Sequence, residues 1–358
     1  MTAALRMAGY LARHLLLDRQ AEFWLGELNP LWSSSETRAR VVAVVEETAD
    51  TRTFVLRPNT GWRGHRAGQH TAVEVEIDGV RLRRCYSVSS APADRLPAIT
   101  VKRMRGGRVS GWIHENVRQG HVLSLGPVAG DFVLPDPPPA KLLMLSGGSG
   151  ITPVMSMLRE LAARGAVRDL VFMHHARSRA DVIFGNALTE LAGRHCGLRL
   201  LLCLGDSASG SGRFDEARLR ELVPDYAERE TFLCGPPALM ERAGRTWERA
   251  GATGRLRRER FVPVALPSRP AAGAPTVRVC LTRSGRSFAA APGTLLDQLE
   301  RAGEHPAFGC RMGICQTCRC RKQAGAVENL LTGAVSSEPD QDIQLCISAP
   351  RSDVELCL

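Results

Sequence analysis

The alternation of apolar and polar residues from Ala39 to about Leu134 is typical of β-strands. Runs such as AITVK and HTAVEVEI alternate between the two kinds of side chain or stay apolar over short stretches. The Asp78-Gly79 pair separates two of these runs, and this dipeptide is a signal for a tight hairpin. Roughly six strands in roughly 100 residues predict a small antiparallel β-barrel.

Consecutive prolines in PDPPPA, over residues 135–140, end this pattern, because proline lacks the amide hydrogen that a sheet needs. From Lys141 to Phe261, apolar runs such as DLVFMHH alternate with amphipathic stretches such as PVMSMLRELAARG. That alternation predicts a parallel sheet with helices on both faces.

A segment rich in Pro and Ala follows, and its composition predicts a flexible linker. We therefore expect a multidomain protein with five parts: an N-terminal extension over 1–37, a β-barrel over 38–137, an α/β domain over 138–263, a linker over 264–275 and a third domain over 276–358.

The composition, with 44% hydrophobic and 23% charged residues, is that of a soluble globular protein. No apolar run approaches the roughly 20 residues that span a bilayer, and the start of the chain lacks the cleavage pattern of a secretion signal. The eleven cysteines are an odd number, bunched at one end and otherwise scattered, which argues against a disulfide framework. We expect a cytoplasmic protein, and the sequence leaves its oligomeric state open.

The net charge of +10 is carried unevenly. Residues 276–358 hold nine Lys/Arg and nine Asp/Glu, so the first 275 residues carry the whole excess. A basic body can attract nucleic acid, an anionic membrane surface, or an acidic partner or cofactor. No compact nucleic-acid motif is present, so we do not expect nucleic-acid binding, and a solvated arginine-rich surface is the alternative.

Four cysteines, Cys310, Cys315, Cys318 and Cys346, have the spacing of ligands. The first three form C-x4-C-x2-C, and the fourth follows after 27 residues. This is the plant-type arrangement for a 2Fe-2S cluster. Zinc is the main rival, but zinc sites usually pair two C-x2-C steps and this stretch contains one.

The neighbouring Cys320 and Cys357 fall in strand-like runs, so we interpret both as buried packing residues. The stretch CRMGICQTC, with QLCISAP downstream, resembles the C-terminal ferredoxin module of reductases in the ferredoxin-NAD(P)H reductase superfamily. The resemblance implies an α+β ferredoxin-like β-grasp domain, and it extends over about residues 38 to 358.

The sequence RCYS, from Arg84 to Ser87, resembles the R-x-Y-S flavin motif of that superfamily. The resemblance implies that Arg84 pairs with the flavin pyrophosphate, that Tyr86 packs on the isoalloxazine ring, and that the Ser87 hydroxyl hydrogen-bonds near the atom that receives hydride. Each role suits its side chain, because a guanidinium offers a fork of donors and a phenol ring offers a flat face.

The sequence VKRMRGGRVSGWIHENV resembles the second flavin segment of the superfamily and favours FAD over FMN. A glycine turn and a helix start there receive the pyrophosphate. The residues implied to contact the cofactor are Val101, Lys102, Arg103, Gly107, Val109 and Ser110. For two of the three arginines at 103, 105 and 108, a solvated basic face is the alternative.

The sequence LMLSGGSGITPVMSML places a glycine-rich turn between an apolar strand and a helix expected to begin near Pro153. Glycines let the backbone approach a pyrophosphate, and the helix dipole favours the anion. The turn resembles the nicotinamide-nucleotide turn of the same superfamily, and the residues assigned to it are Gly147, Gly148, Ser149, Gly150, Ile151, Thr152 and Pro153.

Two later motifs complete the expected site. FLCGP places Cys234, followed by Gly235 and Pro236, at the carboxyl end of a strand, where open parallel sheets bind ligands. The resemblance puts this cysteine beside the nicotinamide. RERF resembles the E-x-F ending of the superfamily, which implies that Glu259 and Phe261 approach the flavin. Ser87, Cys234 and Glu259 are therefore the candidate catalytic residues.

The choice between NADPH and NADH depends on HHARSRADVIF. Arg177, Ser178 and Arg179 can hold a 2'-phosphate, and we favour NADPH for that reason. Asp181 keeps NADH possible, because an acidic residue suits the free ribose hydroxyl. The histidines at 174 and 175 are interpreted as strand-end residues and not as catalysts.

The domain order implies an oxidoreductase in which hydride from NAD(P)H reduces FAD, and single electrons then pass through the 2Fe-2S cluster to a partner. We expect that partner to be an oxygenase. The segment NPLWSSSETRARVVAVVEE resembles reductases that serve membrane-bound acyl-CoA desaturases, so a membrane acyl-CoA or fatty-acid desaturase is favoured. The alternatives are the reductase of a soluble oxygenase or haem monooxygenase and, outside enzymes, an iron-sulfur redox sensor.

Residues 1–28 allow two interpretations. They can form an amphipathic helix that touches the inner face of the membrane or a partner, through Leu5, Leu11, Leu15, Leu16, Phe23 and Trp24. They can also pack on the barrel as a structural extension.

Overall fold

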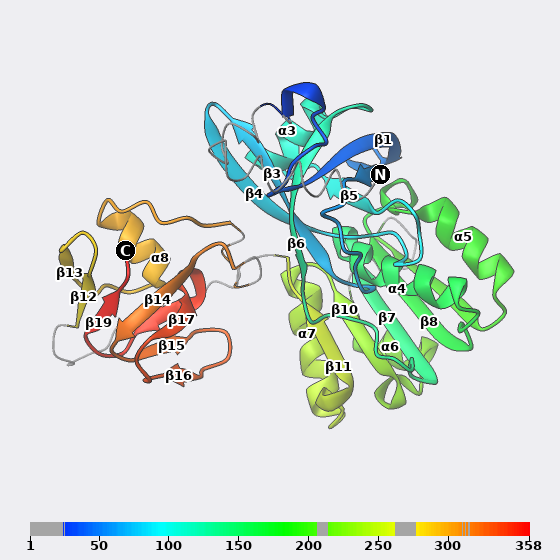
Figure 1. Cartoon of the computed structure of the whole chain (residues 1–358). Helices are drawn as coiled ribbons and strands as arrows, with labels where there is room; N and C mark the ends of the chain where they lie inside the picture. Colours follow the sequence, from blue (N-terminus) through cyan, green and yellow to red (C-terminus); the bar gives the residue numbers. More distant parts are fainter. Residues whose placement is uncertain are drawn as a thin grey trace. The chain divides into compact units, whose positions relative to one another are not determined.

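The computed structural model describes residues 24, 26–205, 214–261, 277–309, 311, 313 and 316–358 (Figure 1). Residues 1–23 and 25 of the N-terminal stretch over 1–28, and the interdomain linker over 264–275, lie outside the described residues. The described chain forms two compact units. The first contains the chain up to Arg260, apart from residues 83–85, and the second contains the part that follows Arg260.

The first unit begins with the predicted antiparallel sheet. In sheet order its strands are β4 (Val80–Ser87), β3 (His70–Ile77), β6 (Val122–Ala129), β1 (Thr37–Thr48), β2 (Thr51–Pro58) and β5 (Ala98–Lys102). The hairpin predicted at Asp78 and Gly79 joins β3 to β4, and both residues have positive φ (54° and 73°), as a tight primed turn requires.

The strand predicted to continue to Leu134 ends earlier than expected. It stops at Ala129, before Gly130, whose φ of +112° leaves the extended region. Val41, Phe54, Val73 and Ile99 are buried in the barrel core together with Val109 and Ile113 from helix α3 (Arg108–Asn116). This helix therefore closes the barrel, and it fixes the loop that precedes it.

The predicted parallel sheet forms the other part of the first unit. In sheet order its strands are β11 (Leu256–Glu259), β10 (Glu230–Cys234), β7 (Lys141–Gly147), β8 (Asp169–Ala176) and β9 (Leu198–Leu204). Almost every residue of β7 and β8 is buried, because helices cover both faces of the sheet.

Helices α6 (Glu216–Leu222) and α7 (Pro237–Arg249) cover one face of this sheet. Leu219 of α6 and Trp247 of α7 belong to one apolar cluster with Leu143, Val171 and Leu233 of the strands. Helix α4 (Ile151–Ala163) packs on β7 and β10 outside that cluster, and α5 (Gly185–Arg194) packs against β9. The carboxyl ends of β7 and β10 are thus held side by side.

Buried polar contacts fasten the barrel to the parallel-sheet part within the first unit. Ser156 Oγ of α4 donates to the Ser90 carbonyl (2.7 Å), and Arg159 Nη1 donates to the Ser89 carbonyl (2.6 Å). The Phe184 amide, at a left-handed residue with φ of 61°, donates to Glu47 Oε2 of β1 (3.2 Å). Specific hydrogen bonds therefore hold the barrel and the parallel-sheet part together.

The second unit is small and mixed in structure. One sheet contains β13 (Ser287–Ala289), β12 (Arg278–Leu281), β19 (Val354–Leu356), β14 (Arg319–Ala324) and β17 (Gln341–Gln344); a second contains β16 (Val335–Ser336), β15 (Val327–Asn329) and β18 (Ser348–Pro350). Helix α8 (Leu295–Arg301) begins with a capping box formed by Thr294 and Asp297.

A lysine is buried inside this second unit. Lys322 has no exposed surface, and its ammonium donates to the carbonyls of Gly325 (2.7 Å) and Glu338 (2.5 Å). Burial lowers the pKa of Lys322, but the two carbonyls satisfy the donors of the charged form. The contact ties strand β14 to the loop before β17.

Candidate active site

The glycine-rich turn lies at the carboxyl end of β7. Residues 148–150 form one turn of 3-10 helix, and α4 begins at Ile151, two residues before the expected Pro153. A β-carbon on Gly150 would lie 2.3 Å from the Cys234 carbonyl oxygen and 2.6 Å from the Gly235 nitrogen. No side chain fits at Gly150, so the start of α4 can lie directly on the end of β10.

The end of β7 and the turn after β10 also approach each other closely, so backbone atoms and not side chains fill the space between them. A β-carbon on Gly235 would lie 3.1 Å from the Gly147 nitrogen, and one on Gly147 would lie 3.0 Å from the Pro236 ring. Cys234 is fully buried, and burial together with the nearby Glu259 raises its pKa well above the usual value. The sulfur is therefore a neutral thiol in a dry corner.

Glu259 lies opposite Cys234 in the parallel pairing of β10 with β11. Glu259 is 8% exposed, and its Oε1 lies 3.7 Å from Nδ1 of the buried His70 of β3. Burial raises the pKa of Glu259, and His70 opposes that shift. Glu259 Oε2 and His70 Nε2 are buried without a hydrogen-bond partner in the described part of the chain. The sequence predicted Glu259 but gave no reason to select His70.

Ser87 lies at the end of β4, where the flavin motif was expected. The Val88 amide donates to the Gln69 carbonyl (2.9 Å), which holds this strand end beside His70. The Ser87 hydroxyl is buried, and Oγ has no partner among the described residues. An unsatisfied buried hydroxyl is costly unless a ligand completes it, so Ser87 fits a bound flavin. Tyr86 packs at the edge of the barrel core, whereas Arg84 is exposed.

The residues of the second predicted flavin segment differ in burial and in their contacts. The side chains of Val101 and Val109 are in the barrel core, so only their backbone atoms can face a cofactor. Ser110 Oγ accepts from the Met104 amide (3.1 Å), and a β-carbon on Gly107 would lie 2.5 Å from that oxygen. These contacts shape the turn before α3. Arg103 is exposed and pairs with Glu115, and the flavin contacts of this segment stay predictions.

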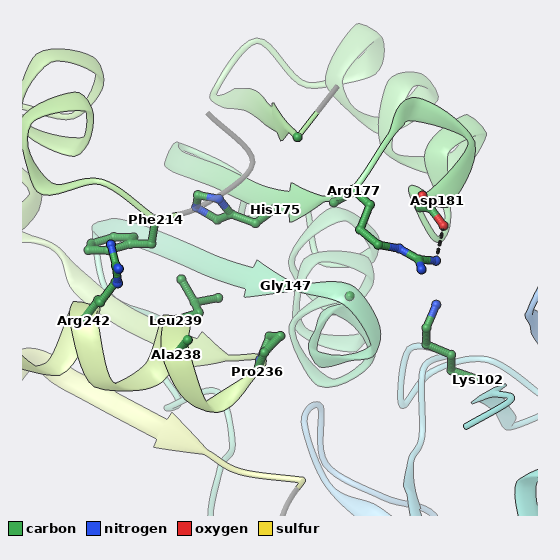
Figure 2. A pocket seen from close by; sticks show the side chains of 13 residues that line it. Lys102, Gly147, His175, Arg177, Asp181, Phe214, Pro236, Ala238, Leu239 and Arg242 are labelled. Carbon is green, nitrogen blue, oxygen red and sulfur yellow. Dashed lines mark hydrogen bonds and ion pairs between the residues drawn. The ribbon is translucent and has the colours of Figure 1, made fainter. Parts of the chain in front are cut away.

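A pocket of about 810 Å³ opens beside the glycine turn (Figure 2). Its lining comes from both parts of the first unit: Lys102, Gly147, Gly148, His175, Ala176, Arg177, Asp181, Gly205, Phe214, Pro236, Ala238, Leu239 and Arg242. Sequence reasoning placed Lys102 along the flavin and missed Phe214, Leu239 and Arg242. The amphipathic pattern of α7 was the signal available, and it does not say which polar residues face a pocket.

Four charged groups form a network at one side of the pocket. Arg177 lies 2.5 Å from Asp181 and 3.5 Å from Asp50, and Lys102 lies 2.7 Å from Asp50. Ser178 Oγ donates to Asp181 (2.7 Å). Hydrogen bonds from Ser178 and Arg177 lower the pKa of Asp181; burial alone would raise the pKa of Asp50, but bonds from Lys102 and two threonines lower it. Both acids are therefore ionised at neutral pH.

The two histidines at the end of β8 differ. His174 is fully buried and shares a hydrogen bond with Ser146 (2.9 Å), and burial lowers its pKa to about 3. It is a neutral structural residue, as expected for a strand end. His175 was assigned the same role, but its ring lines the pocket at 6.1 Å from the Phe214 ring. His175 is therefore also a binding-site candidate.

Two of the four expected cluster ligands are described. Cys310 and Cys315 lie outside the described residues, whereas Cys318 and Cys346 are buried in one core. The Leu345 amide donates to the Cys318 carbonyl (3.1 Å), which brings the two segments together. The Gly313 amide, at φ of +73°, donates to Cys346 Sγ (3.3 Å). Amide hydrogen bonds to thiolate sulfur are typical of iron-sulfur sites, so the geometry fits the cluster.

Cys320 is buried beside this site, and burial raises its pKa to about 11. Its side chain belongs to the same apolar core as Cys318. This placement agrees with the packing role expected for Cys320.

The chain is similar in sequence to known protein families. Family models match three consecutive segments: "Oxidoreductase FAD-binding domain" over residues 38–133, "Oxidoreductase NAD-binding domain" over 144–245 and "2Fe-2S iron-sulfur cluster binding domain" over 280–351. A relative from Mycobacterium tuberculosis named NADPH oxidoreductase is 41% identical over 92% of this chain and 86% of its own length. The chain belongs to the ferredoxin reductase family with a 2Fe-2S domain.

Other similar proteins agree. The glycine betaine monooxygenase reductase subunit of Pseudomonas aeruginosa is 36% identical over 91% of this chain and 98% of its own length. The solved structure of phthalate dioxygenase reductase is 24% identical, covers 90% of this chain and 98% of its own, and has a TM-score of 0.61. At that identity it supports the fold, and the predicted three-domain fold class is confirmed.

This ferredoxin reductase family member is an NAD(P)H-dependent oxidoreductase with FAD and a 2Fe-2S cluster. It is an electron-transfer reductase, as the sequence predicted. Within the described ranges, no helix is long and apolar enough to cross a membrane.

Proposed function

We propose that this reductase oxidises NADPH and passes the electrons, through FAD and the 2Fe-2S cluster, to a separate oxygenase component. The observation that carries the choice of NADPH is the charge of the nucleotide pocket. Three cationic side chains line it, from Lys102, Arg177 and Arg242, against the carboxylate of Asp181 in the lining and that of Asp50, which pairs with Lys102 and Arg177. An excess of positive charge at a dinucleotide site favours the extra phosphate of NADPH.

The residues at the nicotinamide end position the reactants. When bound, FAD supplies two-electron chemistry with hydride and one-electron chemistry with the cluster. The buried Ser87 hydroxyl, which has no partner among the described residues, would donate to the edge of the flavin, and the buried corner of Cys234 and Gly150 would form the wall against which the nicotinamide ring lies. Glu259, beside Cys234, keeps a titratable proton next to the reacting atoms.

The names of two similar proteins support an oxygenase as the acceptor and NADPH as the nucleotide. The Pseudomonas aeruginosa relative is named as the reductase subunit of a glycine betaine monooxygenase, and the Mycobacterium tuberculosis relative as an NADPH oxidoreductase. From these two proteins we infer the class of acceptor and the choice of nucleotide for this reductase, and we assign no particular oxygenase substrate.

Anaerobic titration of the purified holoprotein tests the nucleotide and the internal path. We expect NADPH to bleach the flavin absorbance first and the cluster absorbance afterwards, with NADH reacting more slowly at equal concentration. A protein that stays oxidised with NADPH, or that is reduced faster by NADH, contradicts the proposal. A purified Rieske-type or haem oxygenase component then tests the acceptor, through NADPH consumption coupled to product.

A membrane-bound acceptor, such as the expected desaturase, is the second candidate, because apolar side chains are exposed before β1. Trp24 is 62% exposed, Leu28 74% and Trp32 51%. Arg38 Nη1 donates to the Trp32 carbonyl (3.3 Å), which ties this segment to the barrel. Tryptophan and leucine on a basic protein suit the surface of an anionic bilayer.

Flotation with vesicles that contain phosphatidylserine tests this contact. We expect the wild-type protein to float with the vesicles and the Leu28→Ser, Trp32→Ser double variant to remain below. Val335→Ser is the matched control, because Val335 is also exposed (58%) but belongs to the second unit. Wild-type protein that does not float removes the membrane candidate and leaves the soluble oxygenase.

A further inference from the structure

We propose that Arg242 of α7 is the residue that reads the 2'-phosphate of NADPH. This inference rests on the proposed function, because it concerns how the same pocket selects its nucleotide. The sequence predicted Arg177, Ser178 and Arg179 as the residues that bind this phosphate, whereas the ion pairs of the pocket favour Arg242.

The position of Arg242 supports this role. Arg242 lies in the second turn of α7 and lines the pocket together with Leu239 and Phe214 (Figure 2). Figure 2 shows its side chain beside the Phe214 ring, away from the Arg177 and Asp181 pair. The side chain is exposed to solvent, so an incoming anion reaches it without displacing protein.

The three cationic side chains of the pocket differ in their ion-pair partners. Lys102 is held by Asp50, and Arg177 is held by Asp181 and Asp50. A phosphate that approaches Arg177 must compete with two carboxylates, and it meets their negative charge. Within the described ranges, no carboxylate or other acceptor pairs with the Arg242 guanidinium, and the contact from the Thr246 hydroxyl is to the Arg242 backbone carbonyl (3.1 Å). Its charge is therefore available to a ligand.

The neighbours of Arg242 suit the adenosine end of a dinucleotide. The rings of His175 and Phe214, with centroids 6.1 Å apart, form one wall of the pocket, and an aromatic wall suits a flat adenine lying against it. The pyrophosphate belongs at the glycine turn, because Gly147 and Gly148 line the pocket and α4 begins directly after this turn. The phosphate left for Arg242 is the one on the adenosine ribose, and a guanidinium suits a dianion.

Equilibrium binding of nucleotide fragments tests the assignment without turnover. The probes are 2',5'-ADP, which carries the 2'-phosphate, and 5'-ADP, which lacks it. They are titrated by calorimetry into the oxidised full-length holoprotein, as wild type, Arg242→Gln, Arg242→Lys and Arg245→Gln. Arg245 is the matched control, because it lies one turn along the same helix, loses the same charge, pairs with Glu241 and does not line the pocket.

We expect Arg242→Gln to weaken binding of 2',5'-ADP about 10-fold or more, the loss typical of one charge-assisted contact. Binding of 5'-ADP should change less than about twofold, Arg242→Lys should restore most of the loss, and Arg245→Gln should match wild type. Equal losses for both fragments, or no loss for either, overturn the role of Arg242. If wild-type protein binds the two fragments alike, NADPH selection itself fails, and that result is visible before any variant is measured.

Discussion

The two ends of the nucleotide pocket are built by different means. At the end that we propose for the nicotinamide, beside Gly147 and Pro236 of the lining, Gly150 lies on the Cys234 carbonyl so closely that a β-carbon would approach within 2.3 Å. The other end is lined by charged side chains: Arg242 is exposed, and away from it Lys102 and Arg177 form ion pairs with Asp50 on partly or fully exposed side chains. One end is close-packed backbone and the other is a set of charges.

This difference predicts how each end responds to change. Close packing tolerates little, because an added carbon forces backbone to move. Exposed ion pairs contribute little energy each and are screened by salt, so they can be exchanged at small cost. We therefore expect mutations at the nicotinamide end to abolish or slow hydride transfer, and mutations at the adenosine end to adjust nucleotide preference.

The largest effect is expected for Gly150→Ala. The methyl group collides with the backbone at Cys234 and Gly235, so α4 must shift away from β10. We expect a loss of about 3 kcal/mol in the free energy of unfolding and no measurable flavin reduction by NADPH. Urea denaturation and anaerobic stopped-flow absorbance measure the two quantities.

The control is Gly193→Ala in α5, where no atom lies within 4 Å of the added carbon. That variant should be at least as stable as wild type, because alanine favours helix. Wild-type behaviour of Gly150→Ala would show that the nicotinamide end is not close-packed.

The next largest effect is expected for Cys234→Ala. The thiol is fully buried at the strand end, and its removal loosens the wall against which the nicotinamide is placed. A small misplacement of reacting atoms costs about 100-fold in rate, so we expect flavin reduction by NADPH to slow by that order.

Binding of 2',5'-ADP should be unchanged, because the adenosine end keeps its residues. Cys203→Ala is the control, since Cys203 is buried in β9 of the same sheet. A Cys234→Ala variant that reduces its flavin at the wild-type rate would remove Cys234 from the reaction site.

The close-packed end was largely predictable from the sequence, and the charged end was not. The glycines at 147, 148 and 150 and the FLCGP motif are local patterns, because a backbone that must approach a ligand needs glycine at fixed spacing. Parallel strands bring their carboxyl ends to one edge, so the motifs at the ends of β7 and β10 could be expected to meet.

The charges depend on contacts between distant segments. Arg177 was expected to hold a phosphate, but Asp50, from the turn between β1 and β2, lies against it. Phe214 and Arg242 belong to different elements, and nothing in their spacing shows that both line one pocket. His70 likewise meets Glu259 only through the packing of the barrel on the parallel sheet.

A smaller effect, dependent on pH, is expected for Glu259→Gln. Burial raises the pKa of Glu259 in the folded protein above its ordinary value of 4.5. The protonated form is therefore favoured by folding, and the stability contributed by Glu259 is greatest below about pH 4.5 and falls as the pH rises through the folded pKa. Glutamine does not ionise, so the variant avoids that loss.

We expect the Tm of Glu259→Gln to exceed that of wild type by a few degrees at pH 7.5 and by less at pH 5. Thermal release of FAD fluorescence measures both values. A Tm difference that is the same at both pH values would mean that Glu259 is not ionised in a buried state.

The smallest effect is expected for Asp181→Asn at the charged end. The asparagine side chain would keep a hydrogen bond from Ser178 but remove one of the two carboxylates that hold Arg177, so the Arg177 guanidinium becomes more available to a ligand. We expect the KM for NADPH to fall about threefold, the size of one exposed ion pair, while the KM for NADH changes less. Because exposed charges are screened, the gain should shrink between about 20 mM and about 300 mM NaCl. A rise in the KM for NADPH would show instead that Asp181 positions Arg177 for the nucleotide, and that both ends of the pocket depend on fixed geometry.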